Sequence, residues 1–144
     1  MEHHNLSPRE ILERMLQHDR FTAWMGLQID EIKAGYCRLH FEIKADMLNG
    51  FGRVHGGILF SASDSALAFA CNAHGTLSVA LDASISFTRP AVLGDVIFVE
   101  AKEVHLGNKT AVYDIRCQHA SGHLVAHFKG TAYRTGRAIG TGAD

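Results

Sequence analysis

The alternation of hydrophobic and polar residues predicts strands over much of the chain. Leu39, Phe41 and Ile43 alternate with polar or charged neighbours, which is the period of a strand with one face in water. Turn signals separate four later β-rich runs, and short turns join antiparallel strands. The pattern therefore predicts a five-stranded antiparallel sheet, with strands over residues 36–44, 77–88, 96–106, 109–119 and 123–134.

The N-terminal region has the spacing of a helix. Ser7 is followed by Pro8 and, three residues after Ser7, by Glu10, which is the pattern of a capping box at a helix start. Apolar residues then recur at helical spacing, at Ile11, Leu12, Met15 and Leu16. We expect an amphipathic helix over residues 7–19.

Residues 56–75 are apolar or small on almost every side of a helix. Such a segment is typical of a helix buried all round, and Gly75 is a residue type that commonly follows a helix end. Its small side chains let a sheet pack closely, so five strands of one short chain can curl around it. The expected fold class is α+β, with an antiparallel sheet wrapped around a long central helix and an N-terminal helix before it.

Length and composition favour one domain. With 144 residues, 47% of them hydrophobic, the chain is expected to form a single domain over residues 1–144, with flexible ends at residues 1–6 and 136–144. The chain has fourteen basic and fifteen acidic residues, so no strong electrostatic field favours nucleic acid or a membrane surface as a partner. There is no apolar leader segment and no uncharged membrane span, so we expect a cytoplasmic location.

No metal site is expected from the cysteines and histidines. The three cysteines are odd in number, lie in apolar runs and lack CxxC spacing, so we interpret them as reduced core thiols. His119, His123 and His127 fall four residues apart. The turn signal Ser121-Gly122 breaks this run, and no cysteine or paired carboxylate completes a set of ligands.

Asp64 stands in the middle of the predicted buried helix. An ionised carboxylate in an apolar core is costly, so burial raises its pKa unless a charge or several donors compensate. Two interpretations are open at this point. Asp64 is either a structural residue satisfied by backbone amides or by the serines at positions 61, 63 and 65, or a general base or nucleophile at the edge of a pocket.

The predicted helix start, His55-Gly56-Gly57, is a second candidate for chemistry. The first N–H groups of a helix are unpaired donors at the positive end of its dipole, and glycine permits close approach to the backbone. These amides could polarise a carbonyl group during acyl transfer. The alternative is that Gly56 and Gly57 only pack the entrance of the helix.

The spacing of the two candidates constrains how they act together. Gly56 and Asp64 are eight residues apart, so they lie about 12 Å apart along a helix axis. One carbonyl group cannot easily contact both, because each contact requires about 3 Å. If they cooperate, Asp64 comes from a second subunit across a two-fold axis, and the active unit is a homodimer.

These residues match the pattern of a known family. The chain resembles the hotdog-fold thioesterases of the PaaI type, which are associated with phenylacetate degradation. The matching segments, which keep the spacing of that family, are Asn49-Gly50, residues 55–60, Asp64 and residues 68–72. Phe87-Thr88-Arg89-Pro90 also resembles that family, and the resemblance covers roughly residues 20–135. It implies a hotdog fold, in which dimers pair their sheets and commonly form homotetramers.

The resemblance implies roles for four residues. The Gly56 amide polarises a thioester carbonyl, and Asp64 of the neighbouring subunit attacks the carbonyl carbon or activates water for the attack. His55 fixes the helix entrance or assists at the carbonyl, and Asn49 orients water or substrate. The implied reaction is hydrolysis of acyl-CoA thioesters, with phenylacetyl or hydroxyphenylacetyl as the acyl group; coenzyme A is part of the substrate and no cofactor is implied.

The two halves of that substrate require different residues. The phosphates of coenzyme A require cations, for which Arg89, Lys109 and Arg134 are candidates, although each is also explained as a solvated surface charge. Substrate binding is also assigned to Gly57 and Phe51. An apolar slot for an aromatic ring is expected from Met47, Leu48, Phe51, Phe60 and Leu67, of which Phe60 and Leu67 are better explained as core.

Two other functions could use the same residues. A hotdog enoyl-CoA hydratase or dehydratase would direct a histidine and a carboxylate at substrate carbon atoms, and His55 with Asp64 could serve that purpose. A non-catalytic acyl-CoA-binding module would keep the pocket and dispense with Asp64. The His-Gly-Gly helix start and its spacing to Asp64 favour thioester hydrolysis.

Overall fold

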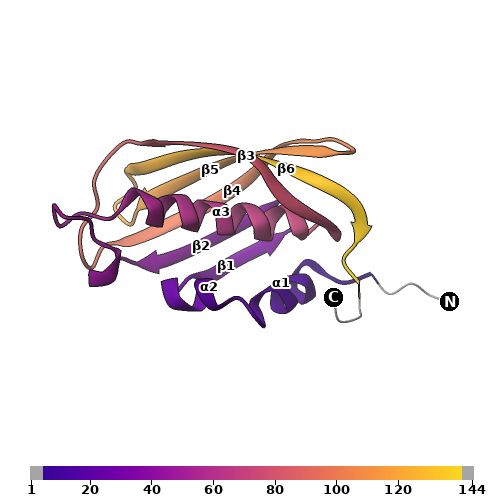
Figure 1. Cartoon of the computed structure of the whole chain (residues 1–144), viewed down its shortest axis with the longest axis horizontal. Coiled ribbons are helices and arrows are strands. Elements are labelled where there is room, and N and C mark those ends of the chain that lie inside the picture. Colours follow the sequence, from indigo (N-terminus) through magenta and orange to yellow (C-terminus); the bar gives the residue numbers. More distant parts are fainter. Residues whose placement is uncertain (1–4, 141–144) are drawn as a thin grey trace.

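Six antiparallel strands form one curved sheet in the computed structural model of the protein, which describes residues 5–140 (Figure 1). The strand order is β1-β2-β4-β5-β6-β3, so β3 lies at one edge of the sheet although it follows β2 in the chain. The strands are β1 (Gln28–Lys33), β2 (Tyr36–Glu42), β3 (Thr76–Phe87), β4 (Val96–Leu106), β5 (Thr110–His119) and β6 (Leu124–Ala138).

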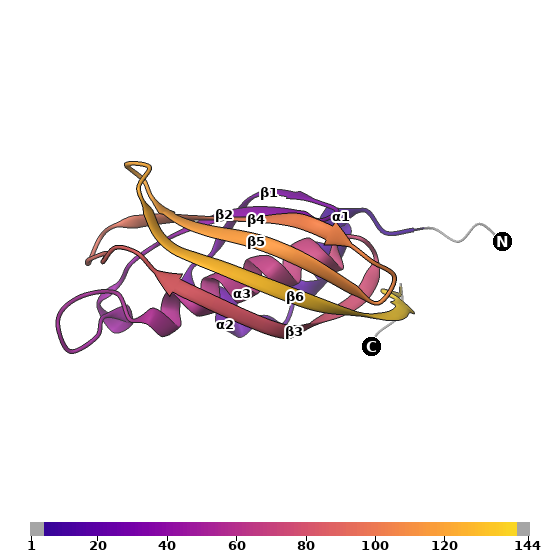
Figure 2. The same cartoon turned by 90° about the horizontal axis from the view of Figure 1, so that it is seen from above.

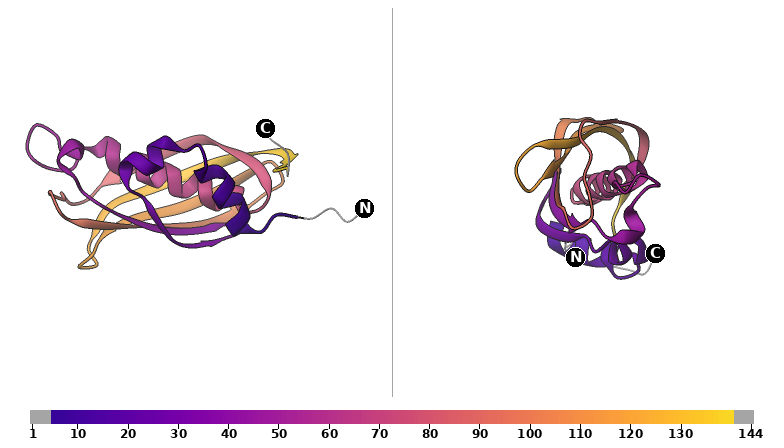
Figure 3. Two further views of the ribbon diagram at one scale, coloured as in Figure 1. Left: turned by 90° about the horizontal axis from the view of Figure 1, so that it is seen from below. Right: turned by 90° about the vertical axis from the view of Figure 1, so that its left-hand side faces the viewer.

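The long helix α3 (Gly56–Asn72) lies lengthwise in the concave face of this sheet, and the end-on view shows the strands curling around it (Figures 2 and 3). Ala62, Ala66 and Ala70 are fully buried on the side facing the strands. Because these side chains are small, the sheet backbone can approach the helix closely. The predicted α+β hotdog arrangement, a sheet wrapped around a central helix with an N-terminal helix before it, is confirmed.

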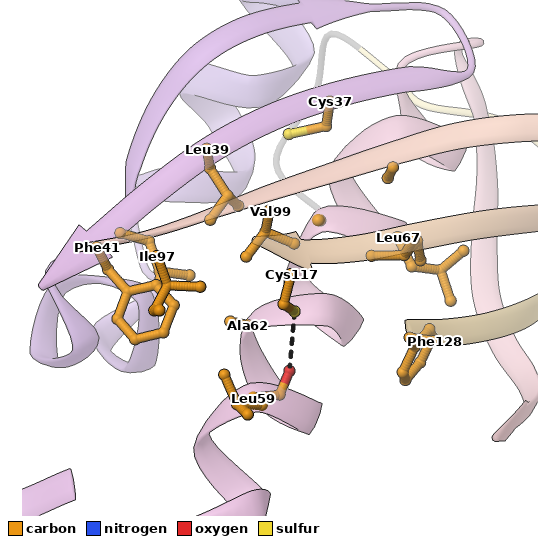
Figure 4. Packing of buried hydrophobic residues seen from close by; sticks show 14 of the residues in the cluster. Cys37, Leu39, Phe41, Leu59, Ala62, Leu67, Ile97, Val99, Cys117 and Phe128 are labelled. Carbon is orange, nitrogen blue, oxygen red and sulfur yellow. Dashed lines mark hydrogen bonds between the residues drawn. The ribbon is translucent and has the colours of Figure 1, made fainter. Parts of the chain in front are cut away.

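The core lies between α3 and the sheet. Figure 4 shows Leu59, Ala62 and Leu67 of the helix among aliphatic and aromatic side chains of the strands. The buried Ser63 hydroxyl donates to the Leu59 carbonyl oxygen at 2.8 Å and lies 3.1 Å from the Cys117 sulfur, so its polarity is satisfied within the core. The cysteines are free and buried, and burial raises the pKa of the Cys117 thiol to about 11.

The sheet differs from the prediction at the first and the last strand of the chain, β1 and β6. β1 was not predicted, and it adds a sixth strand beside β2. β6 continues to Ala138, beyond the expected strand end at residue 134, and the Ile139 N–H then donates to the Gly75 carbonyl oxygen at 2.8 Å. Part of the expected flexible C-terminal end is therefore strand. Of the expected flexible ends, residues 1–4 and 141–144 lie outside the described residues.

The N-terminal region forms two helices where one was predicted. α1 (Pro8–Leu16) starts at the predicted capping box, with Ser7 and Glu10 exchanging hydrogen bonds of 3.1 Å. Asp19, the predicted end of that helix, instead caps a second helix, α2 (Arg20–Met25), by accepting the Thr22 N–H at 2.9 Å. A short 3-10 helix, η1 (Ala45–Met47), precedes the loop that leads to α3.

α3 ends three residues before the predicted glycine. The Asn72 side chain donates to the Ser78 carbonyl oxygen at 3.1 Å and accepts the Ser78 N–H at 2.9 Å, which ties the end of the helix to the start of β3. Gly75 adopts a positive φ of 91° in the turn that follows. No helix within residues 5–140 has both the length and the apolar character needed to cross a membrane.

Candidate functional site

One face of α3 is open from Gly57 to Ala68, so the prediction of a helix buried all round is wrong. Gly57 and Phe60 are exposed, and the partly exposed residues that follow them recur every three or four positions. This spacing places them on one face of the helix, away from the sheet. The sheet of one chain is not wide enough to enclose this face, which comprises Gly57, Phe60, Ser61, Asp64, Ser65 and Ala68.

The start of α3 leaves one backbone donor unpaired. The Gly57 N–H donates to His55 Nδ1 at 2.9 Å, and the Ile58 N–H donates to the His55 carbonyl oxygen at 2.9 Å. Because Nδ1 accepts a hydrogen bond, the proton of the neutral His55 ring lies on Nε2. The Gly56 N–H has no acceptor among the described residues, so it is a free donor at the positive end of the helix dipole.

Gly56 also permits a close contact that another residue would obstruct. A Cβ atom on Gly56 would lie 2.9 Å from Cζ of Phe87, whose ring stands beside the helix start. Around these two residues is a cavity of about 430 Å³ that also includes Asn49 and Arg89. The structure therefore brings together three predicted site residues, Asn49, Gly56 and Arg89. Phe87 was quoted only as part of the family resemblance, because its packing on a glycine has no sequence signal.

Asn49 shapes the loop before α3. Its Oδ1 atom accepts the Phe51 N–H at 2.9 Å and the Arg53 N–H at 3.2 Å, and its own N–H donates to the Arg53 carbonyl oxygen at 2.7 Å. The Nδ2 group has no partner among residues 5–140, so it remains a donor for a ligand in the cavity. Phe51 is 92% exposed at the tip of this loop and lines neither of the cavities described here.

Asp64 has no hydrogen-bond partner within the described part of the chain. Burial raises the pKa of its carboxyl group. Of the three serines suggested as its partners, Ser63 bonds to the Leu59 carbonyl oxygen and to Cys117, and neither Ser61 nor Ser65 bonds to the carboxylate in residues 5–140. The interpretation of Asp64 as a structural aspartate satisfied by its own helix therefore finds no support.

Asp64 opens instead into a larger cavity of about 850 Å³. The second half of α3 and the first residues of β3 form its walls, and the end of α1 and the last residues of β6 close its far end. Sequence analysis assigned no binding role to the α1 and β6 contributions, because these segments are remote from the motif in the chain. They include Arg14, Met15, Gln17, His18, Arg137 and Gly140.

The two cavities are separate on one chain. Gly56 lines only the smaller cavity and Asp64 only the larger one, and the two residues lie about 12 Å apart along the helix. One side provides a backbone donor for an oxyanion, and the other provides a carboxylate that lacks a partner in the described chain. Acyl transfer requires a group of each kind.

Beside the open face of α3, strand β3 presents an unpaired edge. It pairs only with β6, so the outer edge of its twelve residues has no strand partner among the described residues. Long edge strands are templates for pairing with another chain. Several large apolar side chains of this strand are exposed, namely Leu77, Val79, Leu81 and Phe87.

Of the other predicted binding residues, Lys109, Arg134 and Phe60 line neither cavity, whereas Leu67 lines the larger one. Lys109 is at the β4–β5 turn, where its carbonyl oxygen accepts the Arg134 N–H at 2.7 Å. Arg134 donates a further bond from Nη1 to the Gly107 carbonyl oxygen at 3.0 Å, so it supports the turn. Phe60 contacts Phe128 edge to face with ring centres 5.2 Å apart. Leu67 is buried in the core, where it also forms part of the wall of the larger cavity.

The histidines that suggested a metal site lie near the β5–β6 turn. His119 and His123 stack with ring centres 4.6 Å apart, and each has Nδ1 2.8 Å from the Ser121 hydroxyl. His127 is paired with Asp114 further along β6. In residues 5–140 no three histidine, cysteine or carboxylate side chains are grouped as metal ligands.

Comparison with known proteins identifies the family of the chain. Residues 51–126 match the family described as the thioesterase superfamily. Among curated proteins, a relative from Archaeoglobus fulgidus named as an esterase is 39% identical over 124 residues, which cover 86% of this chain and 80% of the relative. The acyl-coenzyme A thioesterase PaaI of Escherichia coli is 37% identical over 125 residues, covering 87% of this chain and 89% of that protein.

Solved structures give the same result. The structure of the E. coli PaaI protein, from the phenylacetic acid degradation operon, has a TM-score of 0.89 to this chain at 34% identity, covering 92% of this chain and 96% of that one. A hypothetical thioesterase from Streptococcus pneumoniae, solved with coenzyme A, has a TM-score of 0.75 at 27% identity, covering 78% of this chain and 88% of that one.

Proposed function

The chain is a thioesterase and belongs to the thioesterase superfamily, and from this premise we propose that it hydrolyses acyl-CoA thioesters at sites shared between two subunits. The observation that carries the proposal is the separation of Gly56 and Asp64 into two cavities on one chain. A two-fold axis beside the open face of α3 would bring the helix start of one subunit to the middle of the partner helix.

In the proposed site the Gly56 N–H of one subunit binds the thioester oxygen. This donor is free, fixed by the helix and reinforced by the helix dipole, so it stabilises the negative charge that develops on the oxygen in the transition state. Asn49 offers its Nδ2 group in the same cavity, and His55 holds the helix start through Gly57. Backbone and side-chain donors thus converge on one small volume.

The partner subunit contributes its Asp64 carboxylate. As a general base it takes a proton from water while the water oxygen attacks the carbonyl carbon; the carbon–sulfur bond then breaks, and the thiolate of coenzyme A leaves and is protonated. As a nucleophile it would form a mixed anhydride that water opens in a second step. Both routes need the ionised carboxylate, and both fit a group without a hydrogen-bond partner in its own chain.

The two cavities suit the two halves of the substrate. Arg89 in the smaller cavity is placed to meet a phosphate of coenzyme A, whereas Lys109 and Phe51 line neither cavity and would contribute only across an interface. The larger cavity has apolar walls that suit an acyl group. We propose an aryl-acetyl group such as phenylacetyl or hydroxyphenylacetyl, supported by the operon from which the E. coli relative comes.

The dimer is supported by the unpaired edge of β3 and by the open face of α3. Pairing two β3 strands would extend the sheet across both subunits and cover exposed apolar side chains at the same time. We propose this homodimer as the active unit, assembled in pairs as a homotetramer. We also place the enzyme in the cytoplasm, since three free buried cysteines are typical of a reducing compartment.

The hydratase alternative has less support. Its histidine would have to act on substrate carbon, but His55 Nδ1 is engaged with the Gly57 N–H, and Asp64 lies about 12 Å further along the same helix. Nothing in the described structure sets the two side chains on one substrate atom. A binding module without catalysis would not need a carboxylate whose burial raises its pKa.

The proposed function is tested with a panel of acyl-CoA thioesters in which free thiol release is followed by colour. Phenylacetyl-CoA, hydroxyphenylacetyl-CoA, straight-chain acyl-CoAs and an enoyl-CoA make up the panel. We expect thiol release with aryl-acetyl substrates and no hydration of the enoyl double bond. Absence of thiol release across the panel contradicts the proposal, and hydration of the enoyl-CoA supports the alternative.

A further inference from the structure

The larger cavity has different chemistry at its two ends. Asp64 lies at one end, and the helix residues from Asp64 to Asn72 line its length. Eight residues of α3 correspond to about 12 Å along the axis, about the length of an extended chain of eight to ten carbon atoms. A phenylacetyl group attached at Asp64 would fill only the near part of such a space.

Cationic and polar side chains gather at the far end. The last residues of β6 lie there, because Thr76 pairs with Ala138 and the Ile139 N–H bonds to the Gly75 carbonyl oxygen. Arg137 is part of this segment. From the other side, the Arg14 guanidinium donates to the Gly140 carbonyl oxygen, so α1 is joined to the end of β6 across the cavity.

Between the two ends the walls are largely apolar. Met15 from α1, Leu67 and Ala68 from α3 and Leu77 and Val79 from β3 line this part. A guanidinium group at the end of a largely apolar passage favours a chain with an anionic end, because the apolar walls suit the chain and the cation pairs with the anion.

Among the described residues, no acidic residue at the far end of the cavity balances the charge of Arg137. Asp64 is the one carboxylate among the described residues that line it, and it lies at the opposite end. The Arg137 side chain forms no ion pair within residues 5–140, and His18 also lines the cavity. A guanidinium group is suited to bind a carboxylate with two parallel hydrogen bonds.

We propose that the far end of this cavity binds a carboxylate on the acyl group, through Arg137. The substrate class is then the CoA monothioesters of dicarboxylic acids, with the thioester at Asp64 and the free carboxylate at Arg137. This inference rests on the proposed function, because it takes the Asp64 end as the reacting end. It adds to the expected aryl-acetyl groups a longer, terminally charged chain that reaches the far end of the cavity.

A structural role for Arg137 is the competing explanation. The C-terminal end of α3 carries no basic residue in its last turn, and a nearby cation would stabilise the negative end of the helix dipole. In that case replacing Arg137 lowers thermal stability and weakens every substrate equally. A role in carboxylate binding affects only the substrate that carries the second carboxylate.

The test compares octanedioyl-CoA monothioester with octanoyl-CoA, which differ only in the terminal carboxylate. Binding is measured by calorimetry on the full chain in an Asp64→Asn background, where turnover is blocked. We expect the octanedioyl thioester to bind about tenfold more tightly, as one charged hydrogen-bonding pair allows. Arg137→Gln should remove this preference without changing the affinity for octanoyl-CoA or the melting temperature.

Arg116→Gln is the matched control. Arg116 is exposed on β5, lies 3.5 Å from Asp114 and lines neither cavity, so the preference should survive this change. Equal binding of the two thioesters overturns the inference, as does a preference that survives Arg137→Gln or a parallel loss of stability and of both affinities. If the preference is present but the unmodified protein releases no thiol from either thioester, the carboxylate site stands and the proposed hydrolysis falls.

Discussion

The start and the middle of α3 differ in how their polar groups are paired. At the start, polar groups are paired with one another: His55 caps Gly57 and Asn49 organises its own loop, so that one N–H, that of Gly56, is left over in a fixed direction. In the middle, Asp64 is partly buried without any hydrogen-bond partner in residues 5–140. The donor is therefore preorganised, whereas the acid is held at a cost in free energy.

This difference explains why neither region is a complete site. A fixed donor stabilises charge on an oxygen but does not generate an attacking group. A carboxylate with a raised pKa takes up a proton more readily than an ordinary aspartate, but it has no carbonyl positioned before it. The two groups lie on one helix about 12 Å apart, so the proposed function requires a second copy of the helix to join them.

The largest effect is expected from removing the acid. Asp64→Asn keeps the shape of the side chain and removes the base or nucleophile, so kcat should fall by about 10²- to 10⁴-fold. Turnover of phenylacetyl-CoA measures the loss. The control is Asp46→Asn, since Asp46 is an exposed carboxylate that lines neither cavity and its loss should leave kcat unchanged. A fully active Asp64→Asn enzyme would remove Asp64 from the mechanism.

The next largest effect is expected from removing the donor, which proline can do at the first position of a helix. Gly56→Pro deletes the N–H, and the His55 backbone already has the extended conformation that a residue before proline adopts, with φ −66° and ψ 135°. We expect kcat to fall by about 10²- to 10³-fold.

Gly56→Ala distinguishes the role of the Gly56 N–H from the role of the close contact between Gly56 and Phe87. Alanine keeps the N–H but places a Cβ atom 2.9 Å from Cζ of Phe87, a ring that is half exposed and can shift. Its kcat should therefore stay well above that of Gly56→Pro. If the two variants lose activity equally, the contact with Phe87 matters and the N–H does not.

A smaller effect is expected at His55, where structure and chemistry can be distinguished. His55→Ala removes the cap on the Gly57 N–H and should lower the free energy of unfolding by about 1 kcal/mol. His55→Asn restores a capping oxygen and should restore stability. Chemical denaturation and kcat are compared for both variants. If His55→Asn is stable but as slow as His55→Ala, the imidazole acts at the carbonyl as well as at the helix start.

The smallest effect is expected in the pH dependence of stability. Because burial raises the pKa of Asp64, the native state binds this proton more tightly than the unfolded chain does. The stability that this proton provides is present below the ordinary pKa of an aspartate and is lost as pH rises through the raised pKa. At neutral pH, Asp64→Asn should therefore be more stable than the unmodified protein.

Urea unfolding at matched protein concentrations, from about pH 4 to about pH 8, measures this difference. The stability advantage of Asp64→Asn should shrink as the pH falls. An advantage that is constant with pH, or absent at neutral pH, would mean that Asp64 is satisfied by a partner in the assembled protein.

Much of the fold could be predicted because its main patterns are local. The capping box at Ser7 and the alternation in β4 each depend on residues within one element, and α1 and β4 start where the sequence indicates. β1 was missed because a register shift between Ile29 and Glu31 interrupts its pairing with β2. Its apolar residues, Ile29 and Ile32, are therefore three apart and lack the period of a strand.

The candidate site could be predicted only in part, for a related reason. The positions of Gly56 and Asp64 on one helix follow from their spacing, and so does the conclusion that they are too far apart to share a carbonyl. The α1 and β6 side of the larger cavity includes Met15 and Arg137, which are more than a hundred residues apart in the chain. No local pattern connects such residues, and Arg137 lies in a glycine-rich segment that was expected to be a flexible end.

The central claim is that each active site combines Gly56 of one subunit with Asp64 of the other, and complementation tests it directly. Asp64→Asn and Gly56→Pro chains are coexpressed with different tags, and heterodimers are purified through both tags. If sites are shared, one site of each heterodimer has both defects and the other has none, so about half of the normal activity returns. If each chain forms its own site, every site keeps one defect, and the heterodimer stays as inactive as its parents.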